Sequence, residues 1–163
     1  MAIADEEFSE LAAALMPQLY RRAYLLTASH QHAEDLTQTA LAKTYDAWWR
    51  VQRAVDPAAY VHGILLKSFL SERRRRSSGE LPVADPKSED AHDHDLADRI
   101  VLVDALAQLA ALDRAVVVLR FWEDRSVEQT AALLNLSSAA VRNRSMRALK
   151  RLRVVLEPAT KGA

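Results

Sequence analysis

The sequence lacks cysteine and contains only 3 glycines among its 163 residues. Without thiols it can form neither disulfides nor thiolate zinc sites, and it has no phosphate-binding glycine loop. No uninterrupted apolar run approaches the roughly 20 residues that a membrane span needs. The first residues, MAIADEEFSE, are acidic and lack the basic-then-apolar order of a signal peptide. These absences predict a soluble, cytoplasmic protein that has no contact with a membrane.

Half of the residues are hydrophobic, and alanine and leucine dominate that half. Valine and isoleucine rarely alternate with polar residues, as they would in the strands of a β-sandwich. Alanine and leucine are strong helix formers, so the composition favours helices. We therefore expect an all-α fold.

The charges balance to a net charge of +0, but they are distributed unevenly along the chain. Arg73 to Arg76 form one basic block, and a second block from Arg142 to Arg153 contains no acid. Between the blocks, Glu80 to Asp98 contains seven acids and the single Lys87. This distribution indicates two small anion-binding helical modules joined by a flexible acidic linker. We accordingly divide the chain into a first module (1–76), a linker (77–95), a second module (96–156) and a tail (157–163).

Apolar periodicity and capping signals predict three helices in the first module. The first would cover residues 8–26, and Pro17 is expected to kink or split it. Ser29 is the expected N-cap of the second, which would end near residue 49. Asp56 followed by Pro57 is a strong start signal for the third, which would end in the first arginine block. The module should form a bundle of three to four helices.

The stretch from Val127 to Arg153 has the layout of a helix-turn-helix. Ser126 to Gln129 has the form of a capping box that opens a short helix, and Ser137 is the expected cap of a second helix. Residues expected on the inner face of the second helix are Val141, Ser145, Ala148, Leu149 and Leu152. In this docking mode the early residues of the second helix meet base edges, while later basic residues meet phosphates. The module is therefore expected to bind DNA.

The segment SVEQTAALLNLSSAAVRNRSMRALKRLR, with ALAQLAALDRAVVVLRFWED before it, resembles region 4 of the extracytoplasmic-function (group IV) sigma factors. LLTASHQHAEDLTQTALAKTYDAWWRV and DPAAYVHGILLKSFLSERRRR resemble region 2 of the same family, in its sigma-E-type branch. The resemblance implies a sigma factor of the sigma-70 family that binds core RNA polymerase and directs promoter-specific initiation. The implied partners are the polymerase β′ coiled coil and β flap, promoter DNA and an anti-sigma factor.

The resemblance also implies where each partner binds. The −35 element would be read by Ser138, Arg142, Asn143, Arg144, Met146, Arg147 and Lys150. The −10 element would meet Tyr60, Lys67, Arg73, Arg74, Arg75 and Arg76. Glu34, Asp35 and Gln38 would dock on the β′ coiled coil. The chain departs from the family pattern at Thr39, where Glu is usual, at Lys67, where Asn is common, and at Ala110-Ala111, where Pro is favoured.

Other classes of function are weighed against this one. No arrangement of Ser, His and Asp suggests a nucleophile, so we expect neither an enzyme nor a cofactor. The alternating His92-Asp93-His94-Asp95 lies in the acidic linker and is interpreted as solvated charge, so no metal is expected. A helix-turn-helix regulator would bind duplex DNA alone as a dimer, and an interaction module would bind acidic partners. Initiation with core polymerase distinguishes the sigma factor from both.

Overall fold

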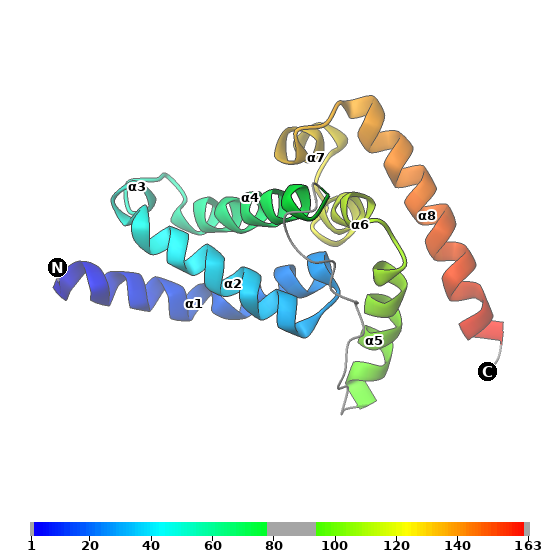
Figure 1. The fold of residues 1–163 in the computed structure, drawn as a ribbon, viewed down its shortest axis with the longest axis horizontal. Coiled ribbons are helices and arrows are strands. Elements are labelled where there is room, and N and C mark those ends of the chain that lie inside the picture. The colour runs from blue at the N-terminus through cyan, green and yellow to red at the C-terminus, as the bar shows by residue number, and fades with distance from the viewer. Residues whose placement is uncertain (1, 78–93, 162–163) are drawn as a thin grey trace. The chain divides into compact units, whose positions relative to one another are not determined.

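The computed structural model of the protein describes residues 2–77 and 94–161, and every regular element in those ranges is a helix (Figure 1). The all-α prediction is confirmed. The helices are α1 (Ala2–Thr27), α2 (His30–Asp46), α3 (Trp48–Val51), α4 (Pro57–Ser77), α5 (His94–Ala107), α6 (Ala111–Val117), the π-helical turn η1 (Val118–Trp122), α7 (Val127–Leu134) and α8 (Ser138–Lys161). No described helix is long and apolar enough to cross a membrane.

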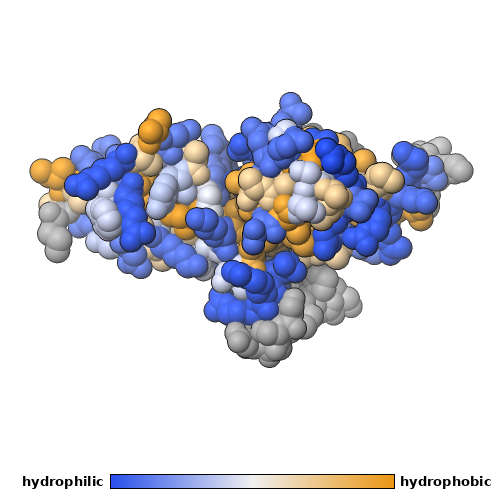
Figure 2. Space-filling view, turned by 90° about the horizontal axis from the view of Figure 1, so that it is seen from above, coloured by the Kyte–Doolittle hydropathy of each residue, from blue (hydrophilic) through white to orange (hydrophobic). Residues whose placement is uncertain are grey.

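The chain forms two compact units. The first contains α1 as far as Tyr24, with α2 to α4, and the second contains Leu25–Ala28 together with α5 to α8. Most of the linker expected at 77–95 lies outside the described residues, as do His92 and Asp93. In the face drawn in Figure 2, hydrophilic residues (blue) cover most of the surface, and hydrophobic residues (orange) appear as smaller patches among them.

Helix α1 continues through Pro17, so of the two expected effects of this residue, a kink or a split, the split does not occur. Leu15 and Leu19 on either side are buried in the core of the first unit, while Pro17 is exposed. A proline in a helix leaves one carbonyl without its intrahelical partner, and on an exposed face that carbonyl can bind water. The buried leucines therefore hold the helix together across the proline.

Helix α2 begins as predicted but ends earlier. The Ser29 hydroxyl accepts a hydrogen bond from the His32 N–H at 3.3 Å, which confirms the N-cap. The helix stops at Asp46 rather than near residue 49, and Trp48 starts the short α3. The break places the Trp48 ring edge-on to Phe8 of α1, with 5.8 Å between ring centroids. The end of α2 thus coincides with a ring contact to another helix, which local sequence does not indicate.

Helix α4 starts where the Asp-Pro signal predicts. The Asp56 carboxylate accepts a hydrogen bond from the Ala59 N–H at 3.1 Å, and Pro57 is the first helical residue. Helices α2 and α4 pack against each other more extensively than any other pair in the first unit. Their buried apolar residues include Ala33, Leu36, Ala40, Val61, Leu65, Leu66 and Phe69. The opposite faces of both helices are left open to solvent.

In the second unit, α5 and α6 are separated without the proline that the family favours. Ala110 has an extended conformation (φ −57°, ψ 147°), and α6 begins at the next residue. The buried Arg114 guanidinium donates to the Leu106 carbonyl at 2.9 Å and to the Leu109 carbonyl at 3.0 Å. The Leu106 carbonyl also accepts from the Leu109 N–H at 3.0 Å, and Leu109 lies beyond the end of α5, so the guanidinium joins the last turn of α5 to the segment before α6. The arginine therefore stabilises the corner between α5 and α6.

Candidate nucleic-acid interface

Helices α7 and α8 form the helix-turn-helix that the sequence predicts. The Ser126 hydroxyl accepts from the Gln129 N–H at 3.0 Å, and the Gln129 side chain accepts from the Ser126 N–H at 2.9 Å, which confirms the capping box. Asn135 ends α7 in the left-handed conformation (φ 56°), which asparagine tolerates. The Ser137 hydroxyl then caps α8 by accepting from the Ala140 N–H at 3.1 Å. Polar contacts thus fix both ends of the turn.

The inner face of α8 agrees with the prediction except at Leu149. Val141, Ser145, Ala148 and Leu152 are buried, whereas Leu149 is 40% exposed. Consecutive residues on a helix differ by about 100° in direction, so a residue next to the buried Ala148 need not share its face. The buried stripe is therefore narrower than the sequence suggests. It fixes which residues of α8 face outward.

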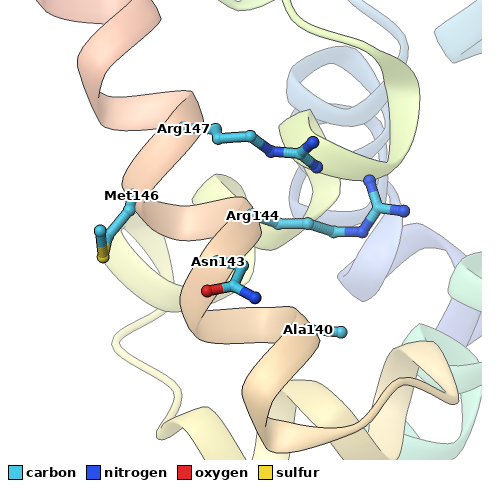
Figure 3. Close-up of a pocket in the computed structure, with 5 residues that line it drawn as sticks. All are labelled: Ala140, Asn143, Arg144, Met146 and Arg147. Atoms are coloured by element: carbon cyan, nitrogen blue, oxygen red, sulfur yellow. The ribbon is translucent and has the colours of Figure 1, made fainter.

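Most of the residues predicted to read the −35 element lie on the outward face. Those that are exposed are Arg142, Asn143, Met146, Arg147 and Lys150, and Ser138 in the first turn is partly exposed. Asn143, Arg144, Met146 and Arg147, together with Ala140, line a shallow pocket of about 490 Å³ (Figure 3). Arg142 lies 3.8 Å from Glu128 of α7, but both side chains are largely exposed, so this ion pair is weak.

Arg144 differs from the other predicted readers because its charge is already paired. Its guanidinium donates to the Asp113 carboxylate of α6 at 2.7 Å, and only 29% of its side chain is exposed. Arg147 approaches the same carboxylate oxygen at 3.7 Å but is 67% exposed. Sequence reasoning missed Asp113, because the residue lies 31 positions before Arg144 and no local signal connects the two.

In the first unit, α2 presents an acidic and amide surface. Glu34, Asp35 and Gln38 are exposed together with Thr39, while the opposite face of α2 is buried against the core. Nearby, burial lowers the pKa of His32, and the positive charge of Arg76 lowers it further, against smaller opposing effects of Glu72 and Asp35. On the exposed face of α2, the carboxylates of Glu34 and Asp35 are open to a basic partner.

Helix α4 exposes a stripe that has an aromatic residue at one end and charge at the other. Tyr60, Lys67 and Arg74 recur every seven residues, so they lie on one face, and all three are exposed. Gly63 belongs to the same stripe, and a Cβ at this position would meet no atom within 4 Å. Arg75 is also exposed, whereas Arg73 and Arg76 are partly buried, and Arg76 pairs with Glu72 at 2.9 Å.

An exposed tryptophan with cationic neighbours lies in the same unit. Trp49 is 54% exposed, and the guanidinium groups of Arg50 and Arg53 lie 4.9 and 6.0 Å from its ring centroid. Tyr45 is held by α1 instead, because its hydroxyl donates to Asp5 at 2.9 Å. The sequence-based candidates for the −10 element do not include Trp49 or these two arginines. The signal in the sequence for this cluster was the position of Arg50 and Arg53, one and four residues after Trp49.

Comparisons with known proteins agree with these two units. Residues 11–79 match the family description Sigma-70 region 2, and residues 99–152 match Sigma-70, region 4. The chain is 38% identical over 154 residues to an RNA polymerase sigma-E factor of Streptomyces antibioticus, covering 93% of this chain and 85% of the relative. It is 29% identical over 146 residues to an ECF RNA polymerase sigma factor, SigL, of Mycobacterium tuberculosis, covering 85% of this chain and 82% of the relative.

The fold is also similar to a solved structure. The sigma factor RpoE of Bartonella quintana, crystallised with the anti-sigma factor NepR, is 24% identical and superposes with a TM-score of 0.71 over 93% of this chain and 98% of the solved one. This likeness supports the arrangement of helices. The two regional matches and the relatives show that the chain belongs to the extracytoplasmic-function sigma factors of the sigma-70 family.

Proposed function

We propose that this sigma factor divides promoter recognition and polymerase binding among three exposed helix faces. As a member of its family it binds core RNA polymerase and directs promoter-specific transcription initiation. The proposal assigns the outward face of α8 to the −35 element, the exposed stripe of α4 to the −10 element and the acidic face of α2 to the polymerase. The alternative of a dimeric helix-turn-helix regulator does not account for the region 2 match over residues 11–79.

The observation that carries the proposal is the division of α8 into a buried and an outward face. Arg142 and Asn143 lie in its first two turns, where the recognition helix of a helix-turn-helix meets base edges. Arginine reads guanine with two hydrogen bonds, and asparagine can read adenine. Lys150 lies eight residues after Arg142, about 12 Å along the axis at roughly 1.5 Å per residue, and so contacts phosphates. Arg144 is paired with Asp113 of α6 and does not read a base.

The exposed stripe of α4 suits single-stranded DNA. A strand of melted DNA needs cations for its phosphates and planar groups on which unstacked bases can lie. Lys67, Arg74 and Arg75 supply exposed charge, Arg73 and Arg76 add charge at the edge, and Tyr60 supplies an exposed ring. The Trp49 ring with its two arginines offers a second place for a base to stack.

The acidic face of α2 suits a basic partner surface. Glu34, Asp35 and Gln38 lie within about one helical turn and can accept hydrogen bonds from arginine and lysine side chains. We assign this face to the β′ coiled coil and place the β flap against the second unit. Thr39, exposed beside them, offers no carboxylate, which limits the charge of the docking face.

The domain boundaries that follow are region 2 at 1–76, a linker at 77–95, region 4 at 96–156 and a tail at 157–163, with α8 extending into the tail as far as Lys161. We further propose that an anti-sigma factor regulates the protein, as a solved sigma factor of similar fold was crystallised with one. The protein acts in the cytoplasm, where polymerase and promoter meet. Its role is to bind and position, without catalysis of its own, cofactor or metal.

Footprinting of the reconstituted holoenzyme tests the three assignments together. On a promoter selected from a randomised pool, the wild-type holoenzyme should protect the −35 element and make thymines near −10 reactive to permanganate. Arg142→Ala should lose protection at −35, while Lys67→Ala should reduce the reactivity at −10. Protection of one short duplex segment, with no melted bases, would support a simple duplex-binding regulator instead.

A further inference from the structure

A carboxylate from a neighbouring helix faces two of the arginines on α8. Asp113 lies in the first turn of α6, and its Oδ1 oxygen is 2.7 Å from Arg144 and 3.7 Å from Arg147. The Asp113 side chain is only 16% exposed. An acid in the first turn of a helix is favoured by the helix dipole alone. That preference does not explain why one oxygen meets two cations of another helix.

The two arginines extend from the same side of α8. Figure 3 shows the Arg144 and Arg147 side chains pointing together away from the helix, while Met146 points to the opposite side. The more buried Arg144 makes the shorter contact, and the more exposed Arg147 makes the longer one. The carboxylate therefore neutralises the inner cation and leaves the outer one available to DNA.

We propose that Asp113 is a specificity-positioning residue, which holds Arg144 away from the DNA so that α8 makes fewer phosphate contacts that ignore sequence. The inference rests on the proposed assignment of α8 to duplex DNA. Each phosphate contact by a cation adds affinity for every sequence equally and contributes to the salt dependence of binding. Holding one flexible arginine in an ion pair thus lowers the affinity for unrelated DNA, while Arg142 and Asn143 remain exposed on the face that meets bases.

Removal of the carboxylate should release Arg144 to the DNA backbone. For Asp113→Ala we expect tighter binding to random-sequence duplex DNA and a plot of log K against log salt that is steeper by about 0.9, the value for one further phosphate contact. The ratio of affinities for a selected −35 duplex and a random duplex should fall. Asp113→Glu, which restores a carboxylate with a longer reach, should recover most of that ratio.

Two controls separate release of the arginine from a change in charge or packing. Asp124→Asn removes the same charge from an exposed site of the second unit, where φ is 54° and asparagine is tolerated. Arg144→Ala breaks the same contact between α6 and α8 but leaves no arginine to reach DNA. Neither control should steepen the salt dependence. The double variant Asp113→Ala/Arg144→Ala should return the salt dependence of Asp113→Ala to the wild-type value or below.

The experiment is a fluorescence-anisotropy titration of the full chain on random and selected duplexes at several salt concentrations, with folding checked by circular dichroism. Asp113→Asn replaces Asp113→Ala if the alanine variant unfolds, with a smaller effect in the same direction. An unchanged slope in the Asp113 variants, or an equal increase in Asp124→Asn, would overturn the inference. Failure of the wild-type chain to bind any duplex in a salt-dependent way would instead overturn the assignment of α8 itself.

Discussion

Arg142 and Arg151 lie on the same helix at different distances from its N-terminus. Arg142 is in the first turns of α8, and Arg151 is nine residues later, about 13 Å further along the axis at roughly 1.5 Å per residue. Arg142→Ala should cost on the order of 1–3 kcal/mol on the correct −35 element and relax discrimination there. Arg151→Ala should weaken all sequences alike and reduce the salt dependence. If Arg142→Ala weakened selected and scrambled DNA equally in a salt titration, the recognition face would be wrongly assigned.

Asp35 is the residue whose charge reversal tests the polymerase surface. Asp35→Arg places a cation against the basic partner expected at α2 and should reduce binding to core polymerase at least tenfold, about 1.4 kcal/mol. Asp46→Arg reverses an exposed acid at the far end of the same helix and is the matched control. Binding is measured by pull-down and titration with labelled core polymerase. Equal losses in both variants would mean that general charge, and not this face, attracts the polymerase.

At the scale of helices, His32 of α2 interacts electrostatically with Arg76 and Glu72 of α4. Protonation of its imidazole disfavours the folded state. The pKa of His32 lies below its usual value of 6.5, because burial and Arg76 disfavour the charged imidazolium. The unfolded chain therefore binds the proton more readily than the folded one. The corresponding stability is fully present above pH 6.5 and is lost as the pH falls through the lowered pKa. Wild type should thus lose stability between neutral and acidic pH.

His32→Gln should show a smaller loss of stability on acidification. Denaturant unfolding is followed by tryptophan fluorescence in a Trp122→Phe background, so that the remaining Trp48 and Trp49 both report on the first unit. Because the histidine is partly exposed, the effect is expected to be modest. Identical pH dependence in the two proteins would show that His32 does not couple folding to pH.

The elements also show which features the sequence could predict. Ser29, the Asp56-Pro57 pair, the Ser126 capping box and Ser137 were predicted, because caps are formed by residues within a few positions of each other. The end of α2 and the continuity of α1 through Pro17 were not, since both involve packing between helices. The Asp113–Arg144 contact joins two elements, and nothing in either segment alone indicates it.

At the scale of the whole molecule, nearly all of the buried core of each unit comes from one side of the segment between α4 and α5, which should allow both halves to stay folded when the chain is cut there. The sequence from Ser77 to His94 contains glycine, two prolines and many acids, and we expect proteases to cut there. Limited proteolysis should release two fragments that keep helical circular dichroism and separate on a column. Rapid digestion of both halves after the first cut would contradict two independently stable domains.

Initiation by reconstituted holoenzyme tests the central claim most directly. A pool of templates with randomised upstream DNA is transcribed with core polymerase alone, with this chain alone and with both together, and the transcripts are sequenced. The account predicts transcripts only from the combination, starting at fixed distances from a shared pair of sequence elements, and their loss with Asp35→Arg. No transcript above the level of core polymerase alone would contradict it.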